Sequence, residues 1–334
     1  MHERCFTGQL ASPPDMIIIL GSSRSGTTWL GKIFDSHPDV IYLHEPDSIL
    51  VNREIPFQVN ENELEEYTTL ASKYMTRLLD VKNIKVSGSL PMFKKNYRNA
   101  IMHLFRYTYV YSSKALQKGI GAGRLRNIGV PDFFSEEIKA SCRHVIKTVD
   151  SLNRAHLFSR AIPNAHILHL IRHPCGYVAS RLRGIKLSLL GSDTFMASIS
   201  RMPEARKRGL SLDYLERLSI EERLACQWMI QNEKTINDME GEGNYKLVIY
   251  DELCQNPMQV TKELFRFSAL DWNSQTEEFI RLCQNARDGK KGYFQVIRNP
   301  AKAAFQWKKE LDRSQISRIM DFVADSAPGR IFHD

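Results

Sequence analysis

The stretch LGSSRSGTTWL at residues 20–30 constrains the fold more than any other part of the sequence. It follows a continuous apolar run at 16–20, which is typical of a buried parallel strand. After it, apolar residues recur at helical spacing over 27–36, and a His-Pro pair ends that run. A strand, a glycine-rich loop and a helix in this order favour an anion site, because loop N–H groups and the helix dipole attract negative charge.

This loop lacks the lysine of a nucleoside-triphosphatase loop, whose pattern is G-x-x-x-x-G-K-[ST]. Gly21 and Gly26 have the required spacing, but Thr27 stands where the lysine belongs. The sequence also has no clear aspartate-ended apolar strand that would help to hold magnesium. We therefore expect a short anionic ligand near Arg24 and no metal. A tight strand-to-helix turn is the alternative for this loop taken alone.

Strands and helices alternate along the rest of the chain, which predicts a parallel α/β sheet with helices on both faces. Further strands are expected at 39–43, 142–150, 166–172 and 245–253. Further helices are expected at 61–80, 153–163, 174–183, 212–239, 259–268, 275–284 and 314–325. No repeat or linker divides the sequence, so we expect one P-loop-like domain over 1–334 with its core at about 16–311.

The composition narrows the class of partner. A formal net charge of +8 favours anionic partners such as nucleotides, nucleic acid, acidic glycans or membrane surfaces. The six cysteines form no C-x-x-C pair, so neither a zinc site nor a disulfide scaffold is expected. No apolar run suits a membrane span or a signal peptide. We expect the chain as given to be cytoplasmic, with the Golgi lumen as the alternative if an upstream anchor was removed.

A second anion site is predicted in HLIRHPCGYVASRLRG. Arg172 ends a buried strand there, and Ser180 lies two turns into the helix that follows. A guanidinium fork with a nearby hydroxyl suits a phosphate monoester, although a strand-end arginine is more often a solvated charge. Two anion sites in one sheet predict a ligand with phosphates at two places.

Five segments in order, RSGTTWL, DSHPDVIYLHEP, VIKTV, HLIRHPCGYVASRL and LVIYDELCQNP, resemble the sulfotransferases that use 3′-phosphoadenosine 5′-phosphosulfate (PAPS). The likeness is greatest to the carbohydrate and tyrosylprotein branches, whose loop has arginine where the cytosolic small-molecule branch has lysine. It covers residues 16 to about 311 and is weak over 60–141.

This resemblance implies a donor site. The loop would cradle the 5′-phosphosulfate with Arg24 facing the sulfuryl group, and Arg172 and Ser180 would bind the 3′-phosphate. Arg298 would reach the same phosphate, and Trp307 would pack on a closing segment. The residues assigned to the donor are Ser23, Arg24, Ser25, Gly26, Thr27, Thr28, Arg172, Ser180, Tyr250 and Arg298. The product would be 3′-phosphoadenosine 5′-phosphate (PAP), and no metal would be required.

The resemblance also implies the catalytic residues. Glu45 matches the family's catalytic base, Lys147 matches a lysine on the bridging oxygen, and Arg24 stabilises sulfuryl charge. His44 is the rival base, because its ordinary pKa lies near neutrality. Alternation along an extended segment predicts that only one of His44 and Glu45 faces the pocket. Trp228 is expected in the core, on the apolar side of its helix.

The expected function is metal-independent transfer of a sulfuryl group to an acceptor hydroxyl, on a carbohydrate or glycoconjugate and not on nucleic acid. A protein tyrosine or a small-molecule alcohol is the alternative acceptor. Segments 83–127 and 186–209 are expected to build the acceptor pocket. Two other classes of function stay open, a P-loop nucleotide kinase or triphosphatase and a basic module that binds nucleic acid or anionic glycan.

Overall fold

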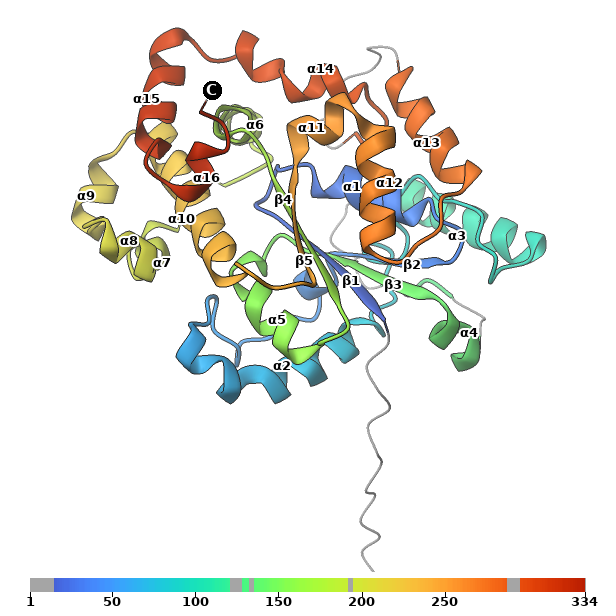
Figure 1. The fold of residues 1–334 in the computed structure, drawn as a ribbon. Coiled ribbons are helices and arrows are strands. Elements are labelled where there is room, and N and C mark those ends of the chain that lie inside the picture. The colour runs from blue at the N-terminus through green and yellow to red at the C-terminus, as the bar shows by residue number, and fades with distance from the viewer. Residues whose placement is uncertain (1–14, 121–127, 132–134, 192–194, 287–294, 334) are drawn as a thin grey trace, which may run out of the picture.

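The computed structural model describes residues 15–120, 128–131, 135–191, 195–286 and 295–333. Within them lies one sheet of five parallel strands in the order β2-β3-β1-β4-β5, with helices on both faces (Figure 1). The strands are β1 (Met16–Leu20), β2 (Val40–His44), β3 (Arg143–Lys147), β4 (His166–Ile171) and β5 (Tyr245–Ile249). The predicted parallel α/β fold is confirmed.

The helices fill the connections between strands and the region after β5. They are α1 (Thr27–Asp35), α2 (Leu64–Leu78), α3 (Ala100–Ile120), α4 (Glu136–Ser141), α5 (Ala155–Ala161), α6 (Pro174–Lys186), α7 (Met196–Ile199), α8 (Pro203–Lys207), α9 (Leu212–Arg217), α10 (Ile220–Asp238), α11 (Tyr250–Gln255), α12 (Pro257–Phe267), α13 (Ser274–Gln284), α14 (Pro300–Ala304), α15 (Arg313–Val323) and α16 (Ala327–Arg330). Short 3₁₀ turns lie at Pro46–Ser48, Glu61–Glu63, Leu152–Arg154 and Gln306–Lys309.

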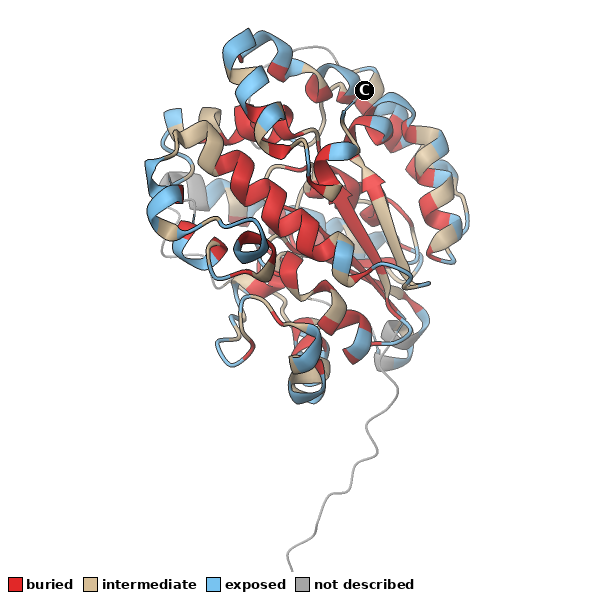
Figure 2. Ribbon diagram, turned by 60° about the vertical axis from the view of Figure 1, so that its left-hand side comes forward, coloured by how far each residue is buried: buried red, intermediate tan, exposed pale blue. Residues whose placement is uncertain are grey.

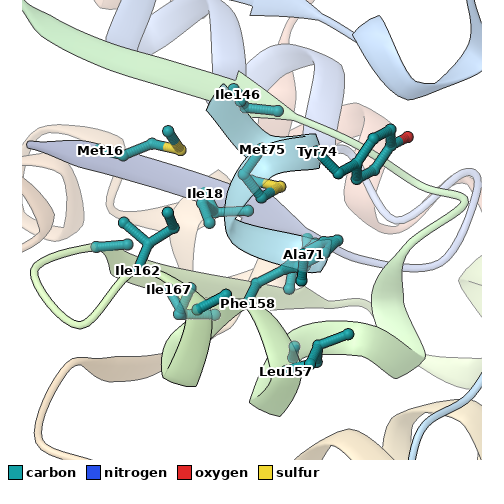
Figure 3. Packing of buried hydrophobic residues seen from close by; sticks show 14 of the residues in the cluster. Met16, Ile18, Ala71, Tyr74, Met75, Ile146, Leu157, Phe158, Ile162 and Ile167 are labelled. Atoms are coloured by element: carbon teal, nitrogen blue, oxygen red, sulfur yellow. The ribbon is translucent and has the colours of Figure 1, made fainter. Parts of the chain in front are cut away.

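The central strand β1 is buried over its whole length, as its continuous apolar sequence predicts. Ile18 faces one layer, where α2 and α5 bring Met75 and Phe158 against the sheet (Figure 3). Ile17 faces the other layer, which includes Phe34 of α1. Figure 2 shows that burial concentrates in the sheet and in the helix surfaces that cover it. Alternate β1 residues therefore pack into the core layers on opposite faces of the sheet.

The order of the strands places a topological switch point at β1. From β1 the chain moves to β2 and β3 on one side, and then crosses over β1 to β4 and β5 on the other. Ligands of parallel sheets bind at the carboxyl ends of the strands where the order reverses. The loop that follows β1 therefore lies where such a ligand is expected.

The long helix predicted at 212–239 is wrong, because two helices occupy this range. The break between α9 and α10 falls at Leu218, which has an extended backbone, and at Ser219, which caps α10. The Ser219 hydroxyl accepts from the Glu222 N–H, and the Glu222 carboxylate accepts from the Ser219 N–H. This capping box restarts the helix after one extended residue. The strand predicted at 245–253 is also shorter, because α11 begins at Tyr250.

Segment 83–127 contains a long helix, α3, although no clear periodicity in this segment predicted it. Arg106 fixes this helix, since its guanidinium donates to the carbonyls of Ser87 and Pro131. Residues 121–127 of the predicted acceptor segment, 192–194 of the other, and Cys5 lie outside the described residues. The other cysteines are buried free thiols at 142, 175, 226, 254 and 283.

Among the described residues, no helix is long and apolar enough to cross a membrane. In the same part of the chain, no three His, Cys, Asp or Glu side chains gather as metal ligands would. Trp228 is fully buried, as predicted, and its indole N–H donates to the Arg172 carbonyl.

Candidate active site

A cavity of about 530 Å³ opens at the carboxyl ends of β1, β2 and β3. Its walls combine the glycine loop, the ends of β2 and β3, and segments from both halves of the chain. The lining residues are Ser23, Arg24, Gly26, Thr27, Thr28, Trp29, Lys32, His44, Glu45, Lys85, Ser89, Leu90, Lys114, Lys147, Val149, Leu190, Gln295, Val296 and Arg298. Most of the predicted donor and catalytic residues therefore meet at one place.

Glycine is required at position 26 of the loop. Gly26 has φ +95°, and a Cβ atom there would lie 2.2 Å from Tyr250 Cε2. The turn is closed by the Ser25 N–H, which donates to the Ser22 carbonyl at 3.0 Å. Ser25 Oγ is buried and has no hydrogen-bond partner within the described residues. A buried hydroxyl without a partner at a helix N-terminus fits a site that an anion completes.

Four predicted donor residues do not line the cavity but lie buried behind it: Ser25, Arg172, Ser180 and Tyr250. Tyr250 packs beneath the loop, where its ring meets Gly26 and makes an edge-on contact with Trp29. The Arg172 guanidinium lies 5.0 Å from the centre of the Tyr250 ring. Tyr250 therefore supports the loop and positions Arg172 at the same time.

Arg172 is only 4% exposed, so the alternative of a solvated strand-end charge is wrong. Its Nη1 donates to the Arg24 carbonyl at 3.2 Å, and its Nη2 donates to the Ala303 carbonyl at 3.0 Å. Its Nε is buried and has no hydrogen-bond partner within the described residues. Arg24 in turn donates from Nε to Ser180 Oγ at 3.1 Å. The two predicted anion sites are therefore in direct contact.

Glu45 and Lys147 form an ion pair, with Lys147 Nζ 2.5 Å from Glu45 Oε1. Lys147 ends β3 and is opposite His44 in β2, so the strand pairing brings Glu45 beside it. The Glu45 N–H also donates to the Lys147 carbonyl at 2.7 Å. Lys85 Nζ approaches the second carboxylate oxygen, Oε2, at 3.2 Å. Each oxygen of Glu45 thus has a cation of its own.

The charges of this pair follow from its surroundings. Burial alone would raise the pKa of Glu45, but the charge of Lys147 and its hydrogen bond outweigh burial and lower that pKa to about 2. Burial lowers the pKa of Lys147, and the Glu45 carboxylate opposes this shift. Glu45 is therefore a carboxylate near neutral pH.

The prediction that only one of His44 and Glu45 faces the pocket is wrong, because both line the cavity. The strand ends at His44, and Glu45 has φ +51°, so alternation does not continue through it. Burial and the positive charge of Lys147 lower the pKa of His44 to about 3. Its Nδ1 lies 3.0 Å from the Tyr42 hydroxyl. The imidazole is therefore neutral near neutral pH.

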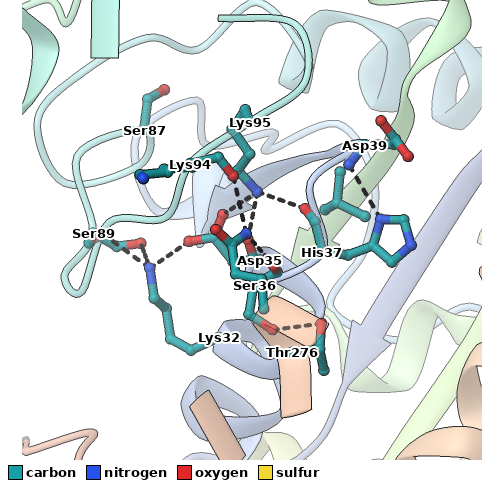
Figure 4. Close-up of polar contacts among 12 residues, drawn as sticks. Lys32, Asp35, Ser36, His37, Asp39, Ser87, Ser89, Lys94, Lys95 and Thr276 are labelled. Atoms are coloured by element: carbon teal, nitrogen blue, oxygen red, sulfur yellow. Dashed lines mark hydrogen bonds and ion pairs between the residues drawn. The ribbon is translucent and has the colours of Figure 1, made fainter. Parts of the chain in front are cut away.

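Three cavity lysines were not predicted: Lys32, Lys85 and Lys114. Lys32 lies on α1 and is bound to Asp35 and to the Ser89 carbonyl (Figure 4). The sequence could have indicated this ion pair, because Asp35 follows Lys32 by three residues on the expected helix. Lys85 and Lys114 lie in the segment without periodicity, and nothing in the sequence distinguished them from surface lysines.

Of the predicted closing segment, Arg298 lines the cavity. Trp307 is buried and stacks on His173, with ring centres 4.4 Å apart. This stacking joins the 3₁₀ turn at Gln306–Lys309 to the start of α6.

Residues 14–274 match a family model described as the sulfotransferase family. The chain belongs to the sulfotransferase family. The matched range includes the glycine loop, Glu45, Lys147 and Arg172, and it ends before Arg298. This sulfotransferase is therefore an enzyme of the transferase class, and the predicted family is confirmed.

Individual relatives agree with the family model. Mouse carbohydrate sulfotransferase 5 is 23% identical over 326 residues, which cover 91% of this chain and 77% of that protein. Human carbohydrate sulfotransferase 1 is 26% identical over 324 residues, which cover 88% of this chain and 74% of that protein. Among solved structures, the sulfotransferase domain of the Synechococcus PCC 7002 olefin synthase matches with a TM-score of 0.46 and 16% identity, covering 94% of this chain and 97% of that one.

Proposed function

We propose that this sulfotransferase transfers the sulfuryl group of PAPS to a hydroxyl of a carbohydrate or glycoconjugate, as a single domain over residues 1–334. The observation that carries this proposal is the Glu45–Lys147 ion pair, which faces a cavity beside an anion-binding loop. The names of the relatives support the acceptor class, since they are carbohydrate sulfotransferases.

The donor fits two buried polar atoms, Ser25 Oγ and Arg172 Nε, for which the described residues provide no hydrogen-bond partner. Ser25 Oγ in the loop would donate to the 5′-phosphosulfate, and Arg172 Nε would donate to the 3′-phosphate. Ser180 Oγ accepts from Arg24 Nε and would donate its own O–H to the same phosphate. Arg24 would then stay beside Ser180 while the rest of its guanidinium reaches toward the sulfuryl oxygens. Two unsatisfied donors at two separate places suit a nucleotide with two anionic ends.

The proposed reaction is an in-line displacement at sulfur. The acceptor oxygen forms a bond to sulfur while the bond between sulfur and the bridging phosphate oxygen breaks. Glu45 accepts the hydroxyl proton, Arg24 stabilises the sulfuryl oxygens, and Lys147 stabilises charge on the departing oxygen. The products are the sulfate ester and PAP, and protein cations supply the positive charge at each developing anion.

Lys147 needs to exchange partners during this cycle. Beside Lys147, the pKa of Glu45 is about 2, which makes Glu45 a weak base. When the bridging oxygen of the donor attracts Lys147, the main cause of that low pKa is removed. Glu45 then becomes a stronger base, while Lys85 still holds its second oxygen. Base strength would therefore depend on the presence of the donor.

Calorimetric titration with PAP in EDTA tests the donor site. We expect micromolar binding that weakens at least about tenfold in Arg172→Ala, because a buried charged hydrogen bond is lost. Arg172→Lys keeps the charge without the fork and should weaken binding as well. Arg160→Ala is the matched control, since Arg160 is exposed on α5. Absence of PAP binding in folded protein, or magnesium-dependent ATP turnover, would contradict the proposal and favour the kinase class.

A further inference from the structure

The cavity has far more positive than negative charge. Among the described residues, its lining has one carboxylate, Glu45, and a neutral imidazole, His44. The cations that line it are Arg24, Lys32, Lys85, Lys114, Lys147 and Arg298. Lys32 is ion-paired with Asp35, a carboxylate that it shares with Lys95. The remaining cations divide into two groups that come from different parts of the fold.

One group belongs to the proposed donor site. Arg24 follows β1, Lys147 ends β3, and Arg298 lies in the segment after β5. The other group, Lys85 and Lys114, comes from the long connection between β2 and β3, which contains α2 and α3. This connection brings Lys85 to Glu45, beside which the acceptor hydroxyl has to lie, and it brings Lys114 to the wall of the same cavity. The second group is therefore placed to meet the acceptor.

Lys114 is a half-buried lysine on α3. Within the described part of the chain, no hydrogen bond or ion pair involves its ammonium group. Burial lowers its pKa, and the positive charge of Lys32 lowers it further. An ammonium group removed from water is unfavourable until an anion meets it. Lys114 thus has unsatisfied charge directed at the cavity.

Lys85 adds a movable charge next to the proposed base. Its side chain is 44% exposed, and its Nζ lies 3.2 Å from Glu45 Oε2 and 2.6 Å from Ser48 Oγ. A four-carbon stem with this exposure can turn from Glu45 to another anion with little loss of packing. An anion that meets Lys85 would lie close to the hydroxyl whose proton passes to Glu45.

We propose that the acceptor glycan has a carboxylate or a sulfate close to the reacting hydroxyl, and that Lys85 and Lys114 bind this anion. The inference rests on the proposed function and specifies its acceptor. Lysine binds as a point charge and does not select the planar geometry of a carboxylate, so both anions suit the site. Separate oligosaccharide probes distinguish a carboxylate from a sulfate.

The test is calorimetric titration of PAP-loaded protein with paired oligosaccharides. One pair is desulfated chondroitin hexasaccharide, which has carboxylates, and its carboxyl-reduced neutral form. The other pair is sulfated keratan hexasaccharide and its desulfated neutral form. We expect at least one anionic member to bind about tenfold or more tightly than its neutral partner, since its anion gains charged contacts that the neutral partner lacks. Filling the donor site with PAP prevents polyanions from binding there.

Variants of the two lysines test whether they cause the preference for the anionic oligosaccharide. We expect Lys114→Met and Lys85→Met each to reduce the anionic preference severalfold, because methionine keeps the stem and removes the charge. Lys73→Met is the control, since Lys73 is exposed on α2, and it should leave the preference unchanged. Thermal unfolding of each variant verifies that it is folded, and Lys114→Gln replaces Lys114→Met if the latter is not.

Three results would overturn the inference. They are equal binding of anionic and neutral members, an anionic preference that survives in both lysine variants, and no oligosaccharide binding by a protein that binds PAP. A protein that fails to bind PAP would instead contradict the proposed function itself. Lys114→Met could also weaken PAP binding as much as it weakens binding of the anionic oligosaccharide. That result would assign Lys114 to the donor site and contradict its proposed role at the acceptor.

Discussion

Two of the regions in which the described residues bury a lysine against a carboxylate differ in what else the carboxylate can meet. In the Lys32 cluster, which comprises Lys32, Asp35, Ser89 and Lys95, each oxygen of Asp35 is bound by one lysine (Figure 4). The remaining contacts of Lys32 go to the Ser89 carbonyl and hydroxyl, and Lys95 donates to backbone carbonyls. The chain itself satisfies this cluster.

The Glu45–Lys147 pair is open by comparison. Lys147 is as deeply buried as Lys32, but the Glu45 side chain is 20% exposed and lines the cavity. Its second oxygen is held by Lys85, a lysine that also reaches solvent. A ligand can therefore compete for each partner. Lys32 lines the same cavity, but its carboxylate partner Asp35 does not, whereas Glu45 does. The difference shows that a buried ion pair has a structural role where the chain encloses its carboxylate, and is available for chemistry where the carboxylate itself lines the active-site cavity.

Glu45→Gln should have the largest effect on activity and only a small effect on PAP binding. We expect kcat to fall by about 10²–10⁴-fold, because the proposed base is removed while the proposed donor site stays intact. Turnover of PAPS with an acceptor used by the wild-type enzyme measures this, and calorimetry with PAP provides the control. Unchanged turnover would exclude Glu45 as the base.

Asp35→Asn should have a large effect on stability and only a small effect on activity, the reverse of Glu45→Gln. The substitution leaves Lys32 and Lys95 buried without their shared counter-charge, so we expect the free energy of unfolding to fall by about 3–5 kcal/mol. Urea unfolding followed by circular dichroism measures this loss. Turnover per folded molecule should change far less than in Glu45→Gln. A stability loss as small as that of an exposed substitution would contradict the structural role of the Lys32 cluster.

Acid should weaken the open pair in a defined pH range. The pKa of Glu45 is lowered from its usual 4.5 to about 2, so the unfolded state binds the proton more tightly than the folded state does. The stabilisation is therefore complete above about pH 4.5 and is lost as the pH falls toward 2. Unfolding free energies of the wild type and Glu45→Gln should converge across this range. Curves that stay parallel would show that the Glu45 pKa is not lowered.

His44→Asn should have the smallest effect. Burial is the largest cause of the low pKa of His44, about 3, and makes its imidazole a weak base, so its replacement should lower kcat by about threefold or less. The pH profile of kcat/KM should keep its acid limb, since that limb belongs to Glu45. A fall in kcat as large as that of Glu45→Gln would make His44 the base.

The sequence predicted the position of those candidate site residues that directly follow a strand. The glycine loop follows its strand directly, and Arg172 follows another, so both reach the carboxyl edge of the sheet. Contacts between site residues that lie far apart in the sequence were harder to predict. Lys147 meets Glu45 only because β2 and β3 are neighbours, and Arg24 meets Ser180 across 156 positions of sequence. Such contacts depend on strand order, which local patterns do not contain.

Other errors have local physical causes. Alternation failed at Glu45 because a single left-handed residue ends the strand geometry. The helix expected at 212–239 failed because Ser219 forms a capping box inside an otherwise helical pattern. Lys85 and Lys114 were not predicted because their connection follows no simple periodicity, and their meaning depends on the cavity that they line.

The measurement that tests the central claim most directly is a pH titration of the Glu45 carboxyl by ¹³C NMR, with and without saturating PAP. Glutamate labelled at the carboxyl carbon, with Glu45→Gln for assignment, makes the signal identifiable. The account predicts a pKa near 2 in the free protein and a clear rise when PAP attracts Lys147 away. A Glu45 pKa that is the same with and without PAP would contradict the exchange of partners and the catalytic role assigned to the pair.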